Sequence, residues 1–151
     1  AQYIAGQGFS NVGLGIVHSM AHSLGAVYDT PHGIANAILL PTVMEYNAPC
    51  TGEKYRGIAK AMGVEGVGKM TLDEARRAAV RGPEGYPGSR RAVDAVKKLA
   101  SDVGIPADLK AIVKPGDVQL LSESAYADAC RPGNPRDTSV EEIAALYRSL
   151  I

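Results

Sequence analysis

Apolar residues recur every three or four positions along most of the chain, the spacing that places them on one face of an α-helix. An alternating apolar and polar pattern, which would indicate a half-buried β-strand, never persists for more than a few positions. The pattern therefore predicts an all-α protein. Its first helix is expected to run from about Ser10 to Leu24, and its second to start at the Thr30-Pro31 pair, an N-cap followed by proline in the first turn.

Glycine and proline interrupt these first two helices. Gly8, Gly13, Gly15 and Gly25 each lower helix stability by about 1 kcal/mol relative to alanine when they are interior, so we expect close packing against another backbone there. Pro41 lies inside the second helix and is expected to kink or end it, because proline removes a backbone hydrogen bond and clashes with the preceding turn.

Start and stop signals define the later helices. Thr71–Glu74 and Thr138–Glu141 match the capping box, in which a threonine and a glutamate satisfy each other's free backbone N–H groups. Residues 91–103 are amphipathic and stop at Gly104, and residues 117–129 predict one further helix. Together these signals indicate a helical bundle.

Composition and charge exclude several classes of protein. A chain of 151 residues is long enough for one domain with a core. Its 16 basic and 16 acidic side chains cancel without a long run of like charge, so we expect no nucleic-acid binding. The longest apolar stretch, residues 34–43, is about half the ~20 residues that a membrane span requires, so we expect no membrane insertion.

The two cysteines, Cys50 and Cys130, lie far apart in the sequence. They match neither a disulfide framework nor a metal-binding pair, which favours ordinary thiols and a cytoplasmic protein. The chain opens on "AQYIAGQGFSN" without a methionine, and we expect it to be a fragment of a longer protein.

All the histidines of the chain, His18, His22 and His32, lie within fifteen positions. His18 and His22 are four residues apart and would share one helix face, while a short turn could bring His32 beside them. Because imidazole is the commonest transition-metal ligand among side chains, a metal site is geometrically available, although hydrogen-bonded core histidines would show the same spacing. A zinc peptidase is excluded, since Ser19 stands where the H-E-x-x-H motif requires glutamate.

The run "GFSNVGLGIVHSMAHSLGAVYDTPHGIANAILLPTVMEYN", residues 8–47, resembles the signature region of the iron-containing, group III alcohol dehydrogenases, in particular the branch acting on lactaldehyde and propanediols. The resemblance extends through "GEKYRGIAKAMGV", "DVGIPADL" and "NPRDTSVEEIAALY". It therefore implies that residues 1–151 form the all-α, carboxy-terminal, metal-binding domain of such an enzyme.

The resemblance also implies a role for each histidine. In this family one aspartate and three histidines bind a divalent metal, Fe²⁺ or in some members Zn²⁺, at the cleft between two domains. By motif position, His18 and His32 match metal ligands. His22 matches a residue that lines the cleft near the nicotinamide, contacts the cofactor and is a catalytic candidate for relaying a proton. Asp29 does not match the family's aspartate.

The remaining parts of such an enzyme are absent from the sequence. The other two ligands and the glycine-rich loop for NAD belong to an upstream nucleotide-binding domain, so we expect the fragment alone to be inactive. Residues 81–90 look like an insertion whose effect on the local helix stays open. A surface that faces the missing domain would leave apolar area exposed, which favours a homo-oligomer. The alternative is a stand-alone helical binding or interaction module without catalysis.

Overall fold

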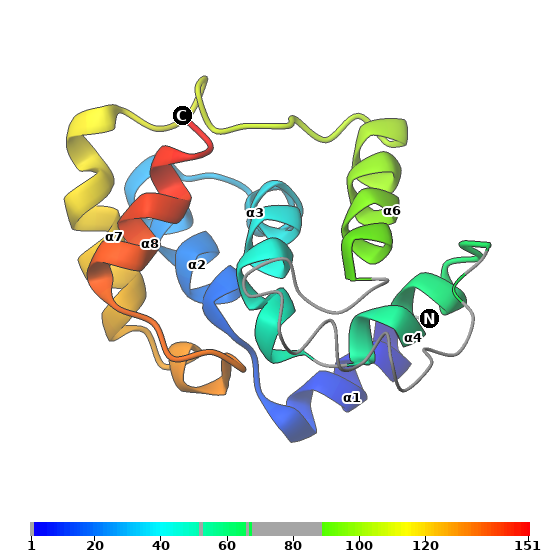
Figure 1. Ribbon diagram of the computed structural model, residues 1–151. Helices are drawn as coiled ribbons and strands as arrows, with labels where there is room; N and C mark the ends of the chain where they lie inside the picture. The colour runs from blue at the N-terminus through cyan, green and yellow to red at the C-terminus, as the bar shows by residue number, and fades with distance from the viewer. Residues whose placement is uncertain (1, 52, 66, 68–88) are drawn as a thin grey trace. The chain divides into compact units, whose positions relative to one another are not determined.

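A computed structural model describes residues 2–51, 53–65, 67 and 89–151, and every regular element among them is helical (Figure 1). The prediction of an all-α fold is therefore confirmed. The elements, in chain order, are α1 (Gln2–Val12), α2 (Ile16–Tyr28), α3 (His32–Asn47), η1 (Ala48–Cys50), α4 (Lys54–Ala61), α6 (Ser89–Asp102), η3 (Pro115–Asp117), α7 (Val118–Ala127), η4 (Arg131–Gly133) and α8 (Val140–Arg148), where η marks a 3-10 helix.

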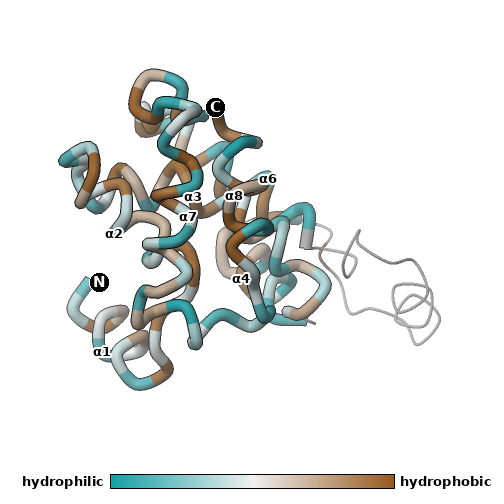
Figure 2. Tube along the Cα trace, turned by 90° about the vertical axis from the view of Figure 1, so that its left-hand side faces the viewer, coloured by the Kyte–Doolittle hydropathy of each residue, from teal (hydrophilic) through white to brown (hydrophobic). Residues whose placement is uncertain are grey.

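The chain divides into two compact units, and the first comprises Ala1–Leu40 and Pro106–Ile151. Within it α7 contacts both α2 and α8. In Figure 2 hydrophobic and hydrophilic stretches alternate along the helices, as expected for elements that bury one face. The fully buried core residues of this unit include Ile16, Met20, Leu24, Leu121, Ile143 and Tyr147.

The second unit, Pro41–Ile105, has a small core of its own. Met44 from α3, Ala59 from α4, and Ala92 and Val93 from α6 are buried together. An exposed ion pair between Lys97 Nζ and Glu45 Oε1, at 2.6 Å, joins α6 to α3. Among the residues that the structure describes, no helix is both long enough and apolar enough to span a membrane.

Glycines separate α1 from α2, so the single first helix predicted above is wrong. Gly13 adopts a left-handed conformation with φ of 81°, which favours glycine over other residues. A β-carbon on Gly15 would lie 3.4 Å from the backbone Cα of Asn134, so the predicted close packing against another backbone is confirmed at this position. Gly8 and Gly25 have ordinary space around them.

The second predicted helix, α3, begins directly after Pro31, as expected. The Pro31 carbonyl accepts the first helical hydrogen bond, whereas the Thr30 hydroxyl is buried and has no hydrogen-bond partner in the described part of the chain. Thr30 is therefore not the side-chain cap that the sequence indicated. The helix continues through Pro41, so proline does not end it.

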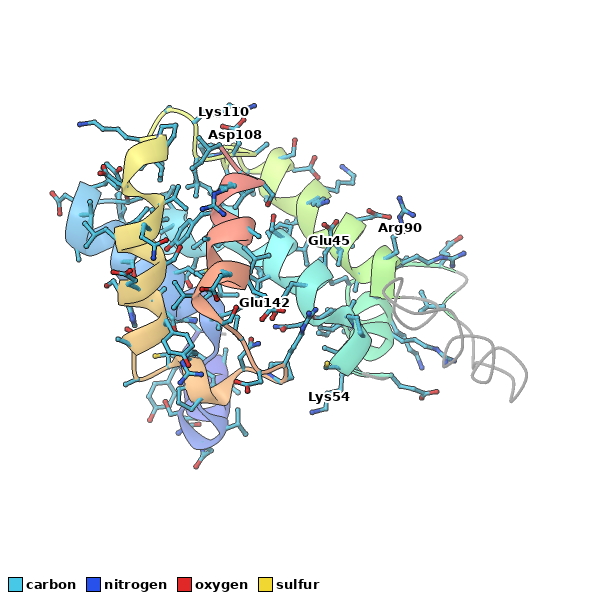
Figure 3. The ribbon with its side chains drawn as sticks, turned by 60° about the vertical axis from the view of Figure 1, so that its left-hand side comes forward. Glu45, Lys54, Arg90, Asp108, Lys110 and Glu142 are labelled. Carbon is cyan, nitrogen blue, oxygen red and sulfur yellow. The ribbon has the colours of Figure 1, made fainter. Side chains whose placement is uncertain are left out.

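A capping box starts α8, one residue later than predicted. Ser139 Oγ accepts a hydrogen bond from the Glu142 N–H at 3.2 Å, and Glu142 Oε2 accepts one from the Ser139 N–H at 3.0 Å (Glu142 is labelled in Figure 3). Thr138 instead donates its hydroxyl hydrogen bond to the carbonyl of Arg136. The predicted box at Thr71–Glu74 and residues 81–88 of the predicted insertion lie outside the described residues.

We expect Ser139→Ala to lower the free energy of unfolding by about 1 kcal/mol, because the change removes the side-chain half of this box. Urea denaturation followed by circular dichroism measures the effect. Ser124→Ala, at an exposed position within α7, is the matched control and should be nearly neutral. Equal midpoints for the Ser139→Ala variant and the unmodified chain would contradict the assignment.

Candidate metal centre

The three histidines gather at one place in the first unit. The ring centroids of His18 and His32 are 5.4 Å apart, those of His22 and His32 are 5.2 Å apart, and those of His18 and His22 are 6.2 Å apart. His18 and His22 project from α2, and His32 is the first residue of α3. Between these helices Asp29 takes a left-handed conformation, with φ of 51°, and its N–H bonds to the Gly25 carbonyl.

His18 favours its neutral form. Partial burial lowers its pKa, the neighbouring His32 and His22 lower it further, and Asp128 opposes them. Since only the neutral imidazole has a free lone pair, this environment keeps His18 able to ligate a cation at neutral pH.

Asn36 holds the ring of His32. The Asn36 amide donates to the backbone carbonyl of His32 at 2.8 Å, and the same nitrogen lies 3.0 Å from His32 Nε2. Because an amide N–H₂ group can only donate, Nε2 is the acceptor in this contact. The side-chain oxygen of Asn36 is buried and has no hydrogen-bond partner among the described residues.

His22 is paired with a carboxylate that the sequence did not identify. Its Nδ1 lies 2.9 Å from Oδ2 of Asp128, the residue that follows α7. The other carboxylate oxygen, Oδ1, accepts hydrogen bonds from Ser19 Oγ at 3.2 Å and from the Cys130 N–H at 2.8 Å. Burial raises the pKa of Asp128, but the hydrogen bonds from Cys130 and His22 outweigh it, so the pKa is lowered and the group stays ionised.

Cys130 also belongs to this cluster. Its sulfur lies within 4.8 Å of the nearest possible ligand atoms of His22 and Asp128. Both Cys50 and Cys130 are free thiols, in agreement with the prediction of no disulfide. Sequence reasoning missed Asp128 and Cys130 because no motif marks either, and Asp128 is 106 residues from the histidine that it contacts.

Comparison with known proteins shows the family. Residues 1–151 match the model of the "Fe-containing alcohol dehydrogenase family, C-terminal". The chain belongs to this family. It is 54% identical over 149 residues to lactaldehyde reductase of Escherichia coli strain K12, an alignment that covers 98% of this chain and 35% of the relative. The 1,3-propanediol dehydrogenase of Klebsiella pneumoniae is 41% identical over 149 residues, with the same coverage.

A solved member of the family has the same helical fold. The alcohol dehydrogenase from Oenococcus oeni superimposes with a TM-score of 0.82 at 36% identity, covering 97% of this chain and 35% of that one. The chain thus spans about a third of the length of the family members that it matches. The predicted resemblance and the predicted fold class are both confirmed.

The arrangement of the histidines fits a divalent transition metal. His18 and His32 come from two helices and lie within one site, and the lowered pKa of His18 favours the neutral imidazole that such an ion requires. His22 differs from them, because the partner of its Nδ1 is a carboxylate.

Proposed function

We propose that this chain is the helical, metal-binding part of a longer iron-dependent alcohol dehydrogenase. The complete protein would interconvert short alcohols or diols and aldehydes with NAD, lactaldehyde and 1,2-propanediol being the favoured pair. The observation that carries the proposal is the 5.4 Å separation of the His18 and His32 rings, which belong to different helices. The identity of 54% to lactaldehyde reductase supports the substrate class.

In this proposal His18 and His32 supply two ligands, and an aspartate and a third histidine come from a nucleotide-binding domain outside these residues. A divalent cation held by these residues would supply Lewis-acid chemistry to the alcohol or aldehyde oxygen. Asn36 contacts His32 at its backbone carbonyl and at ring Nε2, and an ion bound at Nε2 would displace the second of these contacts.

His22 has the geometry of a proton relay. With Nδ1–H donated to Asp128, the lone pair lies on Nε2, which can accept the proton of a substrate hydroxyl. The ionised carboxylate of Asp128 then stabilises the positive charge on the ring. The His22 side chain is 42% exposed, so the proton can leave from it to water.

Metal analysis of single variants, made in the complete protein that carries this chain, tests the proposal. We expect His18→Ala and His32→Ala each to weaken iron binding by more than about 100-fold, since each change removes a direct ligand. His22→Ala should change iron affinity by less than about tenfold, because in this proposal His22 supplies no ligand atom to the iron. Elemental analysis after dialysis against a series of buffered iron concentrations measures the affinities.

His22→Ala is the matched control for the other two changes, since it removes the same side chain from the same cluster. Circular dichroism should show equal helix content in all three variants. Iron loss on His22→Ala with retention in His18→Ala would contradict the assignment of the ligands, and so would retention of iron in all three variants.

A further inference from the structure

A second group of possible ligands lies beside the histidine cluster. His22, Asp128 and Cys130 each offer one ligand atom, and these atoms all lie within 4.8 Å of one another. His22 is exposed, while Asp128 and Cys130 are half-buried, so a cation can reach them from solvent. We propose that these three residues form a zinc site with ligands distinct from His18 and His32.

The carboxylate of this group is already oriented. Ser19 Oγ and the Cys130 N–H both bond to Oδ1 of Asp128, which leaves Oδ2 facing His22 Nδ1 at 2.9 Å. In a tetrahedral zinc site with bonds of about 2.0–2.1 Å, neighbouring nitrogen and oxygen ligands are about 3.3 Å apart. Zinc can therefore replace the proton between these two atoms if the pair opens by a few tenths of an ångström.

The thiol needs only a small movement. A zinc–sulfur bond of about 2.3 Å places sulfur about 3.6 Å from a nitrogen or oxygen ligand of the same ion. Since Cys130 Sγ lies no more than 4.8 Å from the other ligand atoms, it must approach by no more than about 1.2 Å, within reach of a side-chain rotation.

The donor set selects zinc. Thiolate, imidazole and carboxylate are all common zinc ligands, whereas magnesium and calcium prefer oxygen alone. Three protein ligands leave a fourth position for water. When the ion binds, the thiol proton of Cys130 leaves to solvent, and the ring proton of His22 moves from Nδ1 to Nε2 by exchange with water, so the imidazole stays neutral.

Occupancy of this site would have a functional consequence, which rests on the proposed function. A zinc ion bound to His22 and Asp128 breaks the hydrogen bond between them and takes the imidazole out of proton transfer. Zinc would then inhibit the complete enzyme while iron stays on His18 and His32.

Cobalt titration of the chain tests the site directly, because Co²⁺ adopts zinc geometry and a cobalt–thiolate bond produces a charge-transfer absorption in the near ultraviolet. We expect one equivalent of Co²⁺ to produce this band and one equivalent of Zn²⁺ to displace it. Cys130→Ser should abolish the band, and Cys50→Ser, at the other free thiol, should leave it unchanged. Circular dichroism of both variants verifies folding.

A second variant tests the imidazole ligand of the proposed site. His22→Ala should weaken Co²⁺ binding by at least about tenfold. Absence of the band in the unmodified chain, or its persistence in folded Cys130→Ser, would overturn the proposal. His18→Ala and His32→Ala should keep the band, so failure of the zinc site and failure of the proposed iron site give different results.

Discussion

Replacing Gly133 with alanine is expected to lower the free energy of unfolding by about 3 kcal/mol or more, through overpacking against backbone. A β-carbon at this position would clash with the carbonyl oxygen of Leu14 and would lie 3.1 Å from its carbonyl carbon. Because a backbone cannot rotate away as a side chain can, either η4 or the segment between α1 and α2 must move. The space is tight on both sides of this approach, since a β-carbon on Gly15 would lie 3.4 Å from the Cα of Asn134.

A second glycine of a 3-10 helix offers a matched control. Gly116 lies in η3, also directly after a proline, and a β-carbon there would meet no atom within 4 Å. Urea denaturation of Gly133→Ala and Gly116→Ala should therefore give very different midpoints, with Gly116→Ala close to the unmodified chain. Equal midpoints would contradict the close packing of Gly133 in η4 against the backbone of Leu14.

Tyr147→Ala is expected to lower the free energy of unfolding by about 3–5 kcal/mol, the range for removing a large buried aromatic ring. Tyr147 is 0% exposed, and its hydroxyl donates to the backbone carbonyl of Met20 at 2.8 Å. The residue thus ties α8 to α2, the helix that carries His18 and His22. Denaturant titration should place Tyr147→Phe much closer to the unmodified chain, about 1 kcal/mol less stable, because it loses only the hydrogen bond.

Stability measured at alkaline pH distinguishes the contribution of the Tyr147 hydroxyl from that of its ring. Burial raises the pKa of Tyr147 above its ordinary value, with a hydrogen bond to Ser23 opposing the shift. The folded pKa exceeds the unfolded one of about 10, so the contribution of Tyr147 is fully present below pH ~10 and falls as pH rises through the folded pKa. Stability curves of Tyr147→Phe and the unmodified chain should converge above pH ~10, and parallel curves would contradict this.

The sequence predicted most of the helices but not all of their ends. Periodic apolar residues were sufficient to predict α6 and α7. The end of α6 was also predictable, because Gly104, with φ of 78°, follows it. The break between α1 and α2 was not predictable, because the cost of each glycine is small and the close approach of Gly15 to Asn134 is a tertiary contact. The start of α8 was shifted by one residue because Thr138–Glu141 and Ser139–Glu142 match the same motif.

The candidate site was predictable only in part. A helix, a short turn and a second helix suffice to bring His18, His22 and His32 together, so their proximity followed from local structure. Asp128 and Cys130 reach His22 through the packing of α7 on α2, which no local pattern encodes. The roles of the histidines came from family resemblance, and they stay proposals.

We propose different functions for three chemically identical neighbours. His18 is partly buried and its pKa is lowered, which favours metal ligation, and the ring of His32 lies 5.4 Å from it on the next helix. His22 faces a carboxylate and is partly exposed, which favours proton transfer. In this proposal the surroundings of each imidazole ring, and not the spacing of the histidines, distinguish ligand from relay.

A crystal structure of the complete protein loaded with iron, with anomalous diffraction measured at the iron absorption edge, tests this assignment most directly. We expect the iron peak within bonding distance of ring nitrogens of His18 and His32, while His22 Nδ1 remains hydrogen-bonded to Asp128. An iron ion bonded to His22 in place of either His18 or His32 would contradict the account.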